Sequence, residues 1–265
     1  MAGKEEHDVG REPVRNSEER HSGRGRELRN LILGLVKIFE ANSDFLAGQG
    51  WVVSEARSFS WWGGLESPDE VAISSFLVQL TRWETVATVM RRLRVQGIAS
   101  IEAIAKLSVD EIDRAIINVN FHRTKARRLK AFAEEAVRSG GLLNLVTPAN
   151  EERLLEIEGI GRETAKSMLL FIANAPVFPP SKYSQLVLRR LTGLQLSLEE
   201  VEKLVENTVG SDIYALKIIH AGLASVGKAY CSERNPKCGK CPLRGICFFP
   251  NHQGHEKRNS LNHTV

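Results

Sequence analysis

Four cysteines lie within a short segment near the C-terminal end of the 265-residue chain, which contains no other cysteine: Cys231, Cys238, Cys241 and Cys247. Four thiolates spaced C-x6-C-x2-C-x5-C suit one metal centre, and thiolate sulfur is the usual ligand of an iron–sulfur cluster. Structural zinc more often uses two separated close pairs, whereas only Cys238 and Cys241 form one here. Disulfides suit secreted chains, and no signal peptide is apparent. The spacing therefore favours a [4Fe–4S] cluster over zinc or two disulfides.

A Gly-Ile-Gly turn lies in segment 154–165, between a short helical pattern and the start of a second helix. Gly159 and Gly161 lack Cβ atoms, so the backbone can adopt positive φ and approach a ligand closely. The second helix then directs free N–H groups at an anion above the turn, while Ile160 anchors the turn in the core. A plain helical hairpin would also explain these residues. The Leu-x-x-Ile pattern before the turn and Thr-Ala after it favour a phosphate-binding hairpin.

A basic stretch, 122–130, contains five lysines and arginines, Lys125 among them, and directly follows the aromatic Phe121. Charge alone is typical of a solvated helix face. A loop aromatic beside basic residues is also typical of a wedge that enters a base stack, so we expect this segment to contact DNA.

The elements that must position these residues are predicted to be helices. Apolar residues repeat at helical spacing over 28–39, and Ser67, Ser108 and Ser197 each begin a pattern typical of a helix N-terminus with a glutamate three residues later. Period-two alternation is missing over more than a few residues. The sequence therefore predicts an all-α fold of about ten helices.

The overall composition is that of an ordinary globular protein, 42% apolar and 26% charged, with a net charge of +4. This mild basicity permits a polyanionic partner without requiring one. No apolar run approaches the roughly 20 residues that span a bilayer, so we expect no membrane contact and an intracellular location, cytoplasmic or nucleoid-associated. Segments 1–25 and 251–265 are too polar to bury a core and are expected to be disordered tails.

The glycine hairpin followed by this cysteine spacing resembles the endonuclease III superfamily, the helix-hairpin-helix DNA glycosylases of base-excision repair that carry a [4Fe–4S] cluster. The resemblance runs from about residue 61 to 249 and is strongest to the branch related to 3-methyladenine DNA glycosylases. The stretches that carry it to that branch are Trp61-Trp62, 79–86 and 181–184.

The resemblance implies two helical lobes with a DNA-binding cleft between them. Residues 68–175 would form a six-helix barrel with the hairpin, and residues 26–67 and 176–250 the iron–sulfur cluster lobe. The expected partner of this chain, which we expect to be a monomer, is double-stranded DNA whose damaged base is flipped into the cleft.

By the same resemblance, the hairpin Gly159–Gly161 grips a phosphate and Gln79 reaches into the gap left by the flipped base. Asn120 and Phe121 form the loop that wedges the opposite strand. Trp61 and Trp62 line the pocket, where a cationic alkylated purine stacks on indole. Ordinary core packing is the alternative for the two tryptophans.

The chain departs from the family at two reactive positions. Glu163 replaces the lysine whose amine forms a Schiff base in bifunctional members, so lyase chemistry is not expected there; the carboxylate contacts either the flipped base or the helix N-terminus. Ser181 replaces the aspartate that stabilises the sugar cation or activates water, and a hydroxyl is a poor base. Lys182 is a further candidate nucleophile or phosphate contact.

Three candidate functions can be compared with these residues. The first is a monofunctional DNA glycosylase for alkylated or otherwise labile bases, with Ser181, Glu163 and Lys182 as catalytic candidates. The second is a non-catalytic protein that binds damaged DNA, which the loss of the aspartate keeps open. The third, a redox protein unrelated to DNA, explains neither the hairpin nor the basic stretch.

Overall fold

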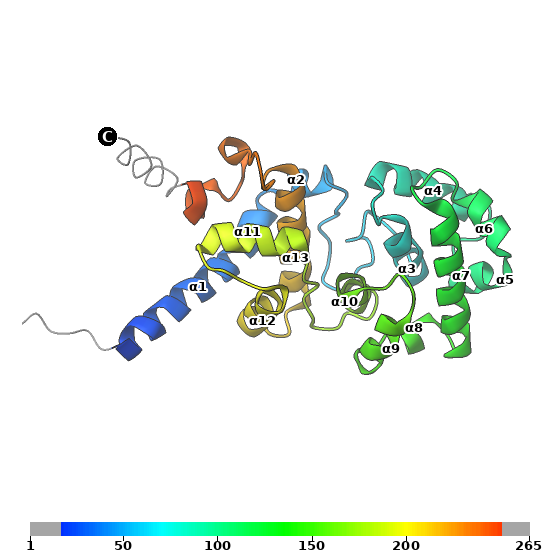
Figure 1. Ribbon diagram of the computed structural model, residues 1–265, viewed down its shortest axis with the longest axis horizontal. Helices are drawn as coiled ribbons and strands as arrows, with labels where there is room; N and C mark the ends of the chain where they lie inside the picture. The colour runs from blue at the N-terminus through cyan, green and yellow to red at the C-terminus, as the bar shows by residue number, and fades with distance from the viewer. Residues whose placement is uncertain (1–16, 251–265) are drawn as a thin grey trace, which may run out of the picture.

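Helices provide the regular structure of the chain in this computed structural model, which describes residues 17–250 (Figure 1). Within that range there is no β-strand, and the single β pairing is an isolated antiparallel bridge between Trp51 and Trp62. The predicted all-α fold is confirmed. The predicted tail 251–265 and most of the tail 1–25 lie outside the described residues.

Two groups of helices lie side by side in Figure 1. The first is contiguous in sequence: α3 (Pro68–Leu77), α4 (Trp83–Val95), α5 (Ile101–Lys106), α6 (Val109–Ala115), α7 (His122–Arg138), α8 (Leu142–Leu145), α9 (Glu151–Glu156) and α10 (Arg162–Phe171). The second joins both ends of the described chain: α1 (Ser17–Glu40), α2 (Ser43–Ala47), α11 (Lys182–Thr192), α12 (Leu198–Val209) and α13 (Ile213–Ala229). Helix α1 begins at Ser17, inside the segment expected to be a disordered tail.

Serine caps begin several of these helices, as the sequence predicts. Ser108 and Ser197 form complete capping boxes with Glu111 and Glu200. At α3 the Ser67 side chain accepts from the Glu70 N–H, but the Glu70 carboxylate instead binds Arg94 and the Glu66 N–H. Each cap satisfies a backbone donor that the helix leaves free.

Buried apolar residues form one connected core through both groups. Helix α7 packs against α5, α6 and α3, while α13 packs against α1, α11 and α12. Helix α10 joins the two groups because it contacts both α3 and α13.

Ion pairs also join α10 to α12 and α9. The Lys166 ammonium lies 3.0 Å from a Glu202 carboxylate oxygen and 3.3 Å from Glu151, and Arg162 lies 2.8 Å from Glu202. Lys166 and Glu202 are both buried, so each charge needs its partner. The described part of the chain also contains no helix long and apolar enough to cross a bilayer.

Candidate functional site

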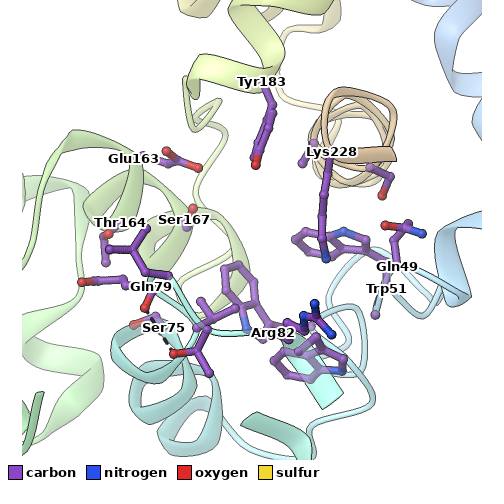
Figure 2. A pocket seen from close by; sticks show the side chains of 18 of the residues that line it. Gln49, Trp51, Ser75, Gln79, Arg82, Glu163, Thr164, Ser167, Tyr183 and Lys228 are labelled. Atoms are coloured by element: carbon purple, nitrogen blue, oxygen red, sulfur yellow. Dashed lines mark hydrogen bonds between the residues drawn. The ribbon is translucent and has the colours of Figure 1, made fainter. Parts of the chain in front are cut away.

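A cavity of about 680 Å³ opens where the two groups of helices meet (Figure 2). Its wall includes residues from the 49–62 loop, the segment after α3, the start of α10, and α11 and α13. The candidate site is therefore assembled from segments far apart in the sequence.

Aromatic rings form one wall of the cavity. Trp51 and Trp62 line it, with ring centroids 5.3 Å apart, and both pack against Phe171 behind them. Trp61 does not line the cavity. Its side chain is fully buried, donates to the Glu55 carbonyl and packs against the ring of Tyr214. The predicted Trp61–Trp62 pair is thus replaced by Trp51 and Trp62.

His220 adds a neutral imidazole to this wall. It is buried beside Trp51, and burial lowers its pKa to about 4. Its Nδ1–H donates to the Pro179 carbonyl at 3.3 Å. The other ring nitrogen, Nε2, then carries no proton and is able to accept a hydrogen bond.

The glycine hairpin lies at the edge of the cavity. Gly159 has φ of 95°, and Arg128 occupies the place that a Cβ would take, so only glycine fits there without strain. Gly161 begins α10 without a side-chain cap and faces open space. Ile160 is buried, as predicted. Free N–H groups at the start of α10 therefore point out of the protein.

Gln79 joins the hairpin to the cavity. It lines the cavity, and its amide donates to the Gly159 carbonyl at 3.1 Å. Sequence-distant segments, the end of α3 and the hairpin, are thereby held together.

Lys125 does not face solvent, contrary to its predicted role in binding DNA. Its ammonium is buried and donates to the carbonyls of Leu77 and Gln79 and to the hydroxyl of Thr81, at 2.8, 2.6 and 2.9 Å. Burial lowers its pKa to about 8. The side chain therefore positions the loop after α3, and any DNA contact of this loop is made by other residues.

Other basic side chains of this stretch pair with carboxylates at the protein surface. Arg128 pairs with Glu158 at 3.0 Å and Lys130 with Glu134 at 3.1 Å, while Arg123 lies 3.9 Å from Asp113. The positive charge of this helix is therefore lower than the sequence alone indicates.

Two exposed apolar residues stand at the rim. Phe121 has φ of 58° and is 65% exposed, and Leu80 has φ of 54° and is 80% exposed. The Asn120 amide donates to the Leu80 carbonyl at 2.6 Å and so ties the two loops together. Non-glycine residues at positive φ are uncommon and mark places where the surroundings hold the backbone.

Glu163 brings a carboxyl group to the cavity. It lies in the first turn of α10, and solvent reaches it through the cavity mouth. The surrounding walls raise its pKa to about 7, and no neighbouring cation offsets that effect. At neutral pH the group is thus present in both protonation states, which suits acid–base work.

Ser181 and Lys182 are not among the cavity residues. Ser181 is buried at the N-cap of α11, where its hydroxyl accepts from the Ser184 N–H at 3.0 Å. Lys182 is exposed outside the cavity. Their neighbour Tyr183 does line it.

Several cavity residues were not identified from the sequence: Trp51, Leu80, Tyr183, His220, Arg82 and Lys228. The stretches that carry the family resemblance, 79–86 and 181–184, do include Leu80, Arg82 and Tyr183, but these three residues were not assigned to the site. Nothing in the local pattern distinguishes Lys228 or His220 from other residues of a long helix.

The cysteine segment follows α13. All four cysteines are half-buried and none forms a disulfide. The sulfurs lie near one another, since Cys231 and Cys238 add to the effect of burial in raising the pKa of Cys241. Within residues 17–250, no three side chains of ligand type are arranged to hold a single metal ion.

Arg190 connects this segment to α11. Its guanidinium donates to the Cys231 sulfur at 3.4 Å and to the carbonyls of Ser232 and Glu233 at 2.8 Å each. A donor set of four thiols without a disulfide fits a cluster in which each iron binds one sulfur.

A family model described as "HhH-GPD superfamily base excision DNA repair protein" matches residues 73–211, just over half of the chain. Among curated relatives, the thymine-DNA glycosylase of Aeropyrum pernix is 23% identical over 197 residues, which cover 72% of this chain and 86% of that protein.

Two solved structures share the fold. An endonuclease III–DNA covalent intermediate superposes with a TM-score of 0.65 at 19% identity and covers 87% of this chain and 99% of its own. A 3-methyladenine DNA glycosylase of H. pylori, bound to 1,N6-ethenoadenine, gives a TM-score of 0.60 at 20% identity, with coverage of 74% and 97%. The names of the thymine-DNA glycosylase and of the 3-methyladenine DNA glycosylase specify different bases.

Proposed function

Because the chain belongs to the HhH-GPD superfamily of base excision DNA repair proteins, we propose that it hydrolyses the bond between a damaged base and its deoxyribose. We further propose that it is monofunctional, releasing the base without cutting the strand, and that its substrates are alkylated bases. Glu163 supports monofunctional action, because by the resemblance it occupies the place of the lysine that forms the Schiff base. The aromatic wall of Trp51 and Trp62 supports a base as the substrate, since a flipped base would stack on it.

The observation that carries this proposal is the Glu163 carboxyl group in the cavity. With a pKa of about 7, its ionised form would accept a proton from water as that water attacks the anomeric carbon. Its charge would also stabilise the positive charge that develops on the sugar. Ser181 is turned away from the cavity, so we assign it the role of helix cap.

Residues around the cavity would provide the proposed contacts with DNA. The free N–H groups of the hairpin suit a backbone phosphate. Gln79 and Leu80 lie where a side chain could fill the gap left by the flipped base, and Phe121 where one could wedge the opposite strand. Double-stranded DNA with a damaged base is therefore the proposed partner, and we propose that the protein acts as a monomer.

We also propose that Cys231, Cys238, Cys241 and Cys247 hold a [4Fe–4S] cluster. When bound, such a cluster would fold the segment after α13 and present its basic side chains to DNA. Arg190 would orient that segment through its contact with Cys231.

The experiment is single-turnover base release from duplexes that each contain one damaged base. The wild-type protein is compared with Glu163→Gln, which keeps the shape of the side chain, and with Ser181→Asp, since aspartate also caps helices. We expect Glu163→Gln to lower the rate about 100-fold and Ser181→Asp to leave it nearly unchanged.

Release by Ser181→Asp alone would reject the proposed role of Glu163. It would instead identify a DNA-binding protein whose chemistry was lost at one residue. Binding of damaged duplexes by the wild type, without release of any base, would also favour that second function.

A further inference from the structure

Two cations line the cavity without a carboxylate partner. Most basic side chains around it are paired, as Arg162 and Lys166 are with Glu202. Among the residues that the structure describes, Arg82 and Lys228 line the cavity, and their side chains make no ion pair or hydrogen bond. Unpaired charges at a site attract a ligand of opposite charge and repel one of like charge.

Both of these cations are exposed to solvent, and of the two it is Lys228 that comes from the second group of helices. Its side chain extends from the last turn of α13 into the cavity, toward the wall formed by Trp51 (Figure 2). Tyr183 borders it on the α11 side. The two helices touch here because Gly227 has no side chain: a Cβ would come within 2.5 Å of Tyr183.

Glu163 and Lys228 reach the cavity from opposite groups of helices and do not form an ion pair. The surrounding cavity walls raise the pKa of Glu163, although solvent reaches its side chain, and no cation offsets that effect. A base stacked on Trp51 would therefore have the ammonium on one side and the Glu163 carboxyl group on the other.

The charge of the base decides what Lys228 does. When the glycosidic bond breaks, its electron pair goes to the base nitrogen. A base that is neutral when bound leaves as an anion, whereas a cationic alkylated base leaves neutral. Water supplies the oxygen that bonds to the sugar, and its proton goes to Glu163. A positive charge beside the base stabilises the departing anion and opposes the binding of a cation.

We propose that Lys228 makes this cavity selective for damaged bases that carry no positive charge, by stabilising the anion that such a base becomes as it leaves. The departed base is then protonated from water. This inference rests on the proposed glycosylase function and narrows its substrates to uncharged adducts. It changes the expectation from the sequence, in which a cationic purine stacks on indole, because the second side of the cavity carries its own cation.

The test measures release of uncharged adducts, 1,N6-ethenoadenine and 3,N4-ethenocytosine, and of cationic bases, 7-methylguanine and 3-methyladenine, from otherwise identical duplexes. Each rate is divided by the spontaneous rate of the same duplex, because cationic bases leave readily unaided. For the wild type we expect the larger enhancement with uncharged bases. Lys228→Gln should lower that enhancement at least tenfold and leave the enhancement for cationic bases unchanged or raised.

Two variants separate this role from simple attraction of DNA. Lys228→Arg keeps the charge and should keep the preference for uncharged bases. Arg82→Gln removes the other unpaired cation and should lower all rates in the same proportion, through weaker DNA binding.

A proportional fall of all rates in Lys228→Gln would overturn the inference, as would a wild type that releases cationic bases only. In both cases the protein remains a glycosylase. If neither the wild type nor any variant releases a base, the proposed function itself fails.

Discussion

Replacement of Lys125 by methionine tests whether this side chain supports DNA binding in addition to the stability of the protein. The ammonium donates three hydrogen bonds, to Leu77, Gln79 and Thr81. Methionine has a similar length and fills the space, but it removes all three bonds: the Leu77 carbonyl loses its donor, the Gln79 carbonyl keeps only a long bond from the Thr81 hydroxyl, and that hydroxyl still accepts from the Asn120 N–H. Each lost partner costs about 1–2 kcal/mol.

Part of that cost is offset because the ammonium is itself expensive to bury. Its pKa falls from 10.5 to about 8, which corresponds to about 3 kcal/mol at roughly 1.4 kcal/mol per unit. The net loss of unfolding free energy in Lys125→Met should therefore be small, about 1–2 kcal/mol. Urea unfolding followed by circular dichroism measures it.

The free energy of DNA binding should fall by an amount similar to this stability change. Leu80 is held at a φ of 54°, a conformation that costs on the order of 1 kcal/mol or more. Without the ammonium the loop can relax away from that conformation and move Gln79 with it. We expect the affinity for a duplex with an abasic-site analogue to fall about tenfold, since 1.4 kcal/mol is a factor of ten.

Fluorescence anisotropy titrations measure that affinity, with Lys203→Met as the matched control. Lys203 is an exposed lysine paired with Glu199 on α12, and its loss should change neither quantity. If Lys125→Met loses stability but binds DNA as tightly as the wild type, the ammonium only fills the core and our assignment is wrong.

Four further predictions follow from single groups. The base-release rate should rise between about pH 6 and pH 8 as Glu163 ionises, and the rise should be absent in Glu163→Gln; an unchanged profile in the variant refutes its role as a base. Gly161→Asp should weaken DNA binding at least tenfold without loss of stability, because a Cβ at Gly161 meets open space; equal affinity in gel-shift titrations would count against the hairpin. Burial lowers the pKa of Lys217 to about 8, so the unfolded state holds this proton longer and the unfolding free energy should rise between pH 8 and about pH 10.5, by up to about 3 kcal/mol more than in Lys217→Met when both are unfolded in urea. Cys241→Ala should abolish the brown colour of the reconstituted protein, and retained colour would exclude Cys241 as a ligand.

The local features of the fold could be predicted from the sequence because their causes are local. Ser108 and Ser197 begin helices through contacts three residues away, and the positive φ of Gly159 follows from the tight turn that it makes. The missing carboxylate at Ser181 was visible in the sequence, but the residue was a catalytic candidate there and its role as the cap of α11 was not predicted.

Features that depend on packing could not be predicted in this way. Adjacency suggested that Trp61 and Trp62 act together, but the two residues lie in a tight turn that buries Trp61 and leaves Trp62 at the cavity. Lys125 looked like a surface charge because nothing in its own helix shows the open carbonyls at the end of α3. His220 and Lys228 line a cavity only because α11 and the 49–62 loop pack against α13.

The packing of α1 against α12 and α13 has a consequence for how the chain folds as it is made. The helices from α3 to α10 form one continuous segment and can assemble as soon as they leave the ribosome. Helix α1 must wait until α13 emerges, with Phe39 uncovered meanwhile; in the finished protein this ring lies against Gly222, where a Cβ would come within 2.1 Å. Synthesis thus passes through a stage in which one half of the molecule is complete and the first helix still lacks its partner.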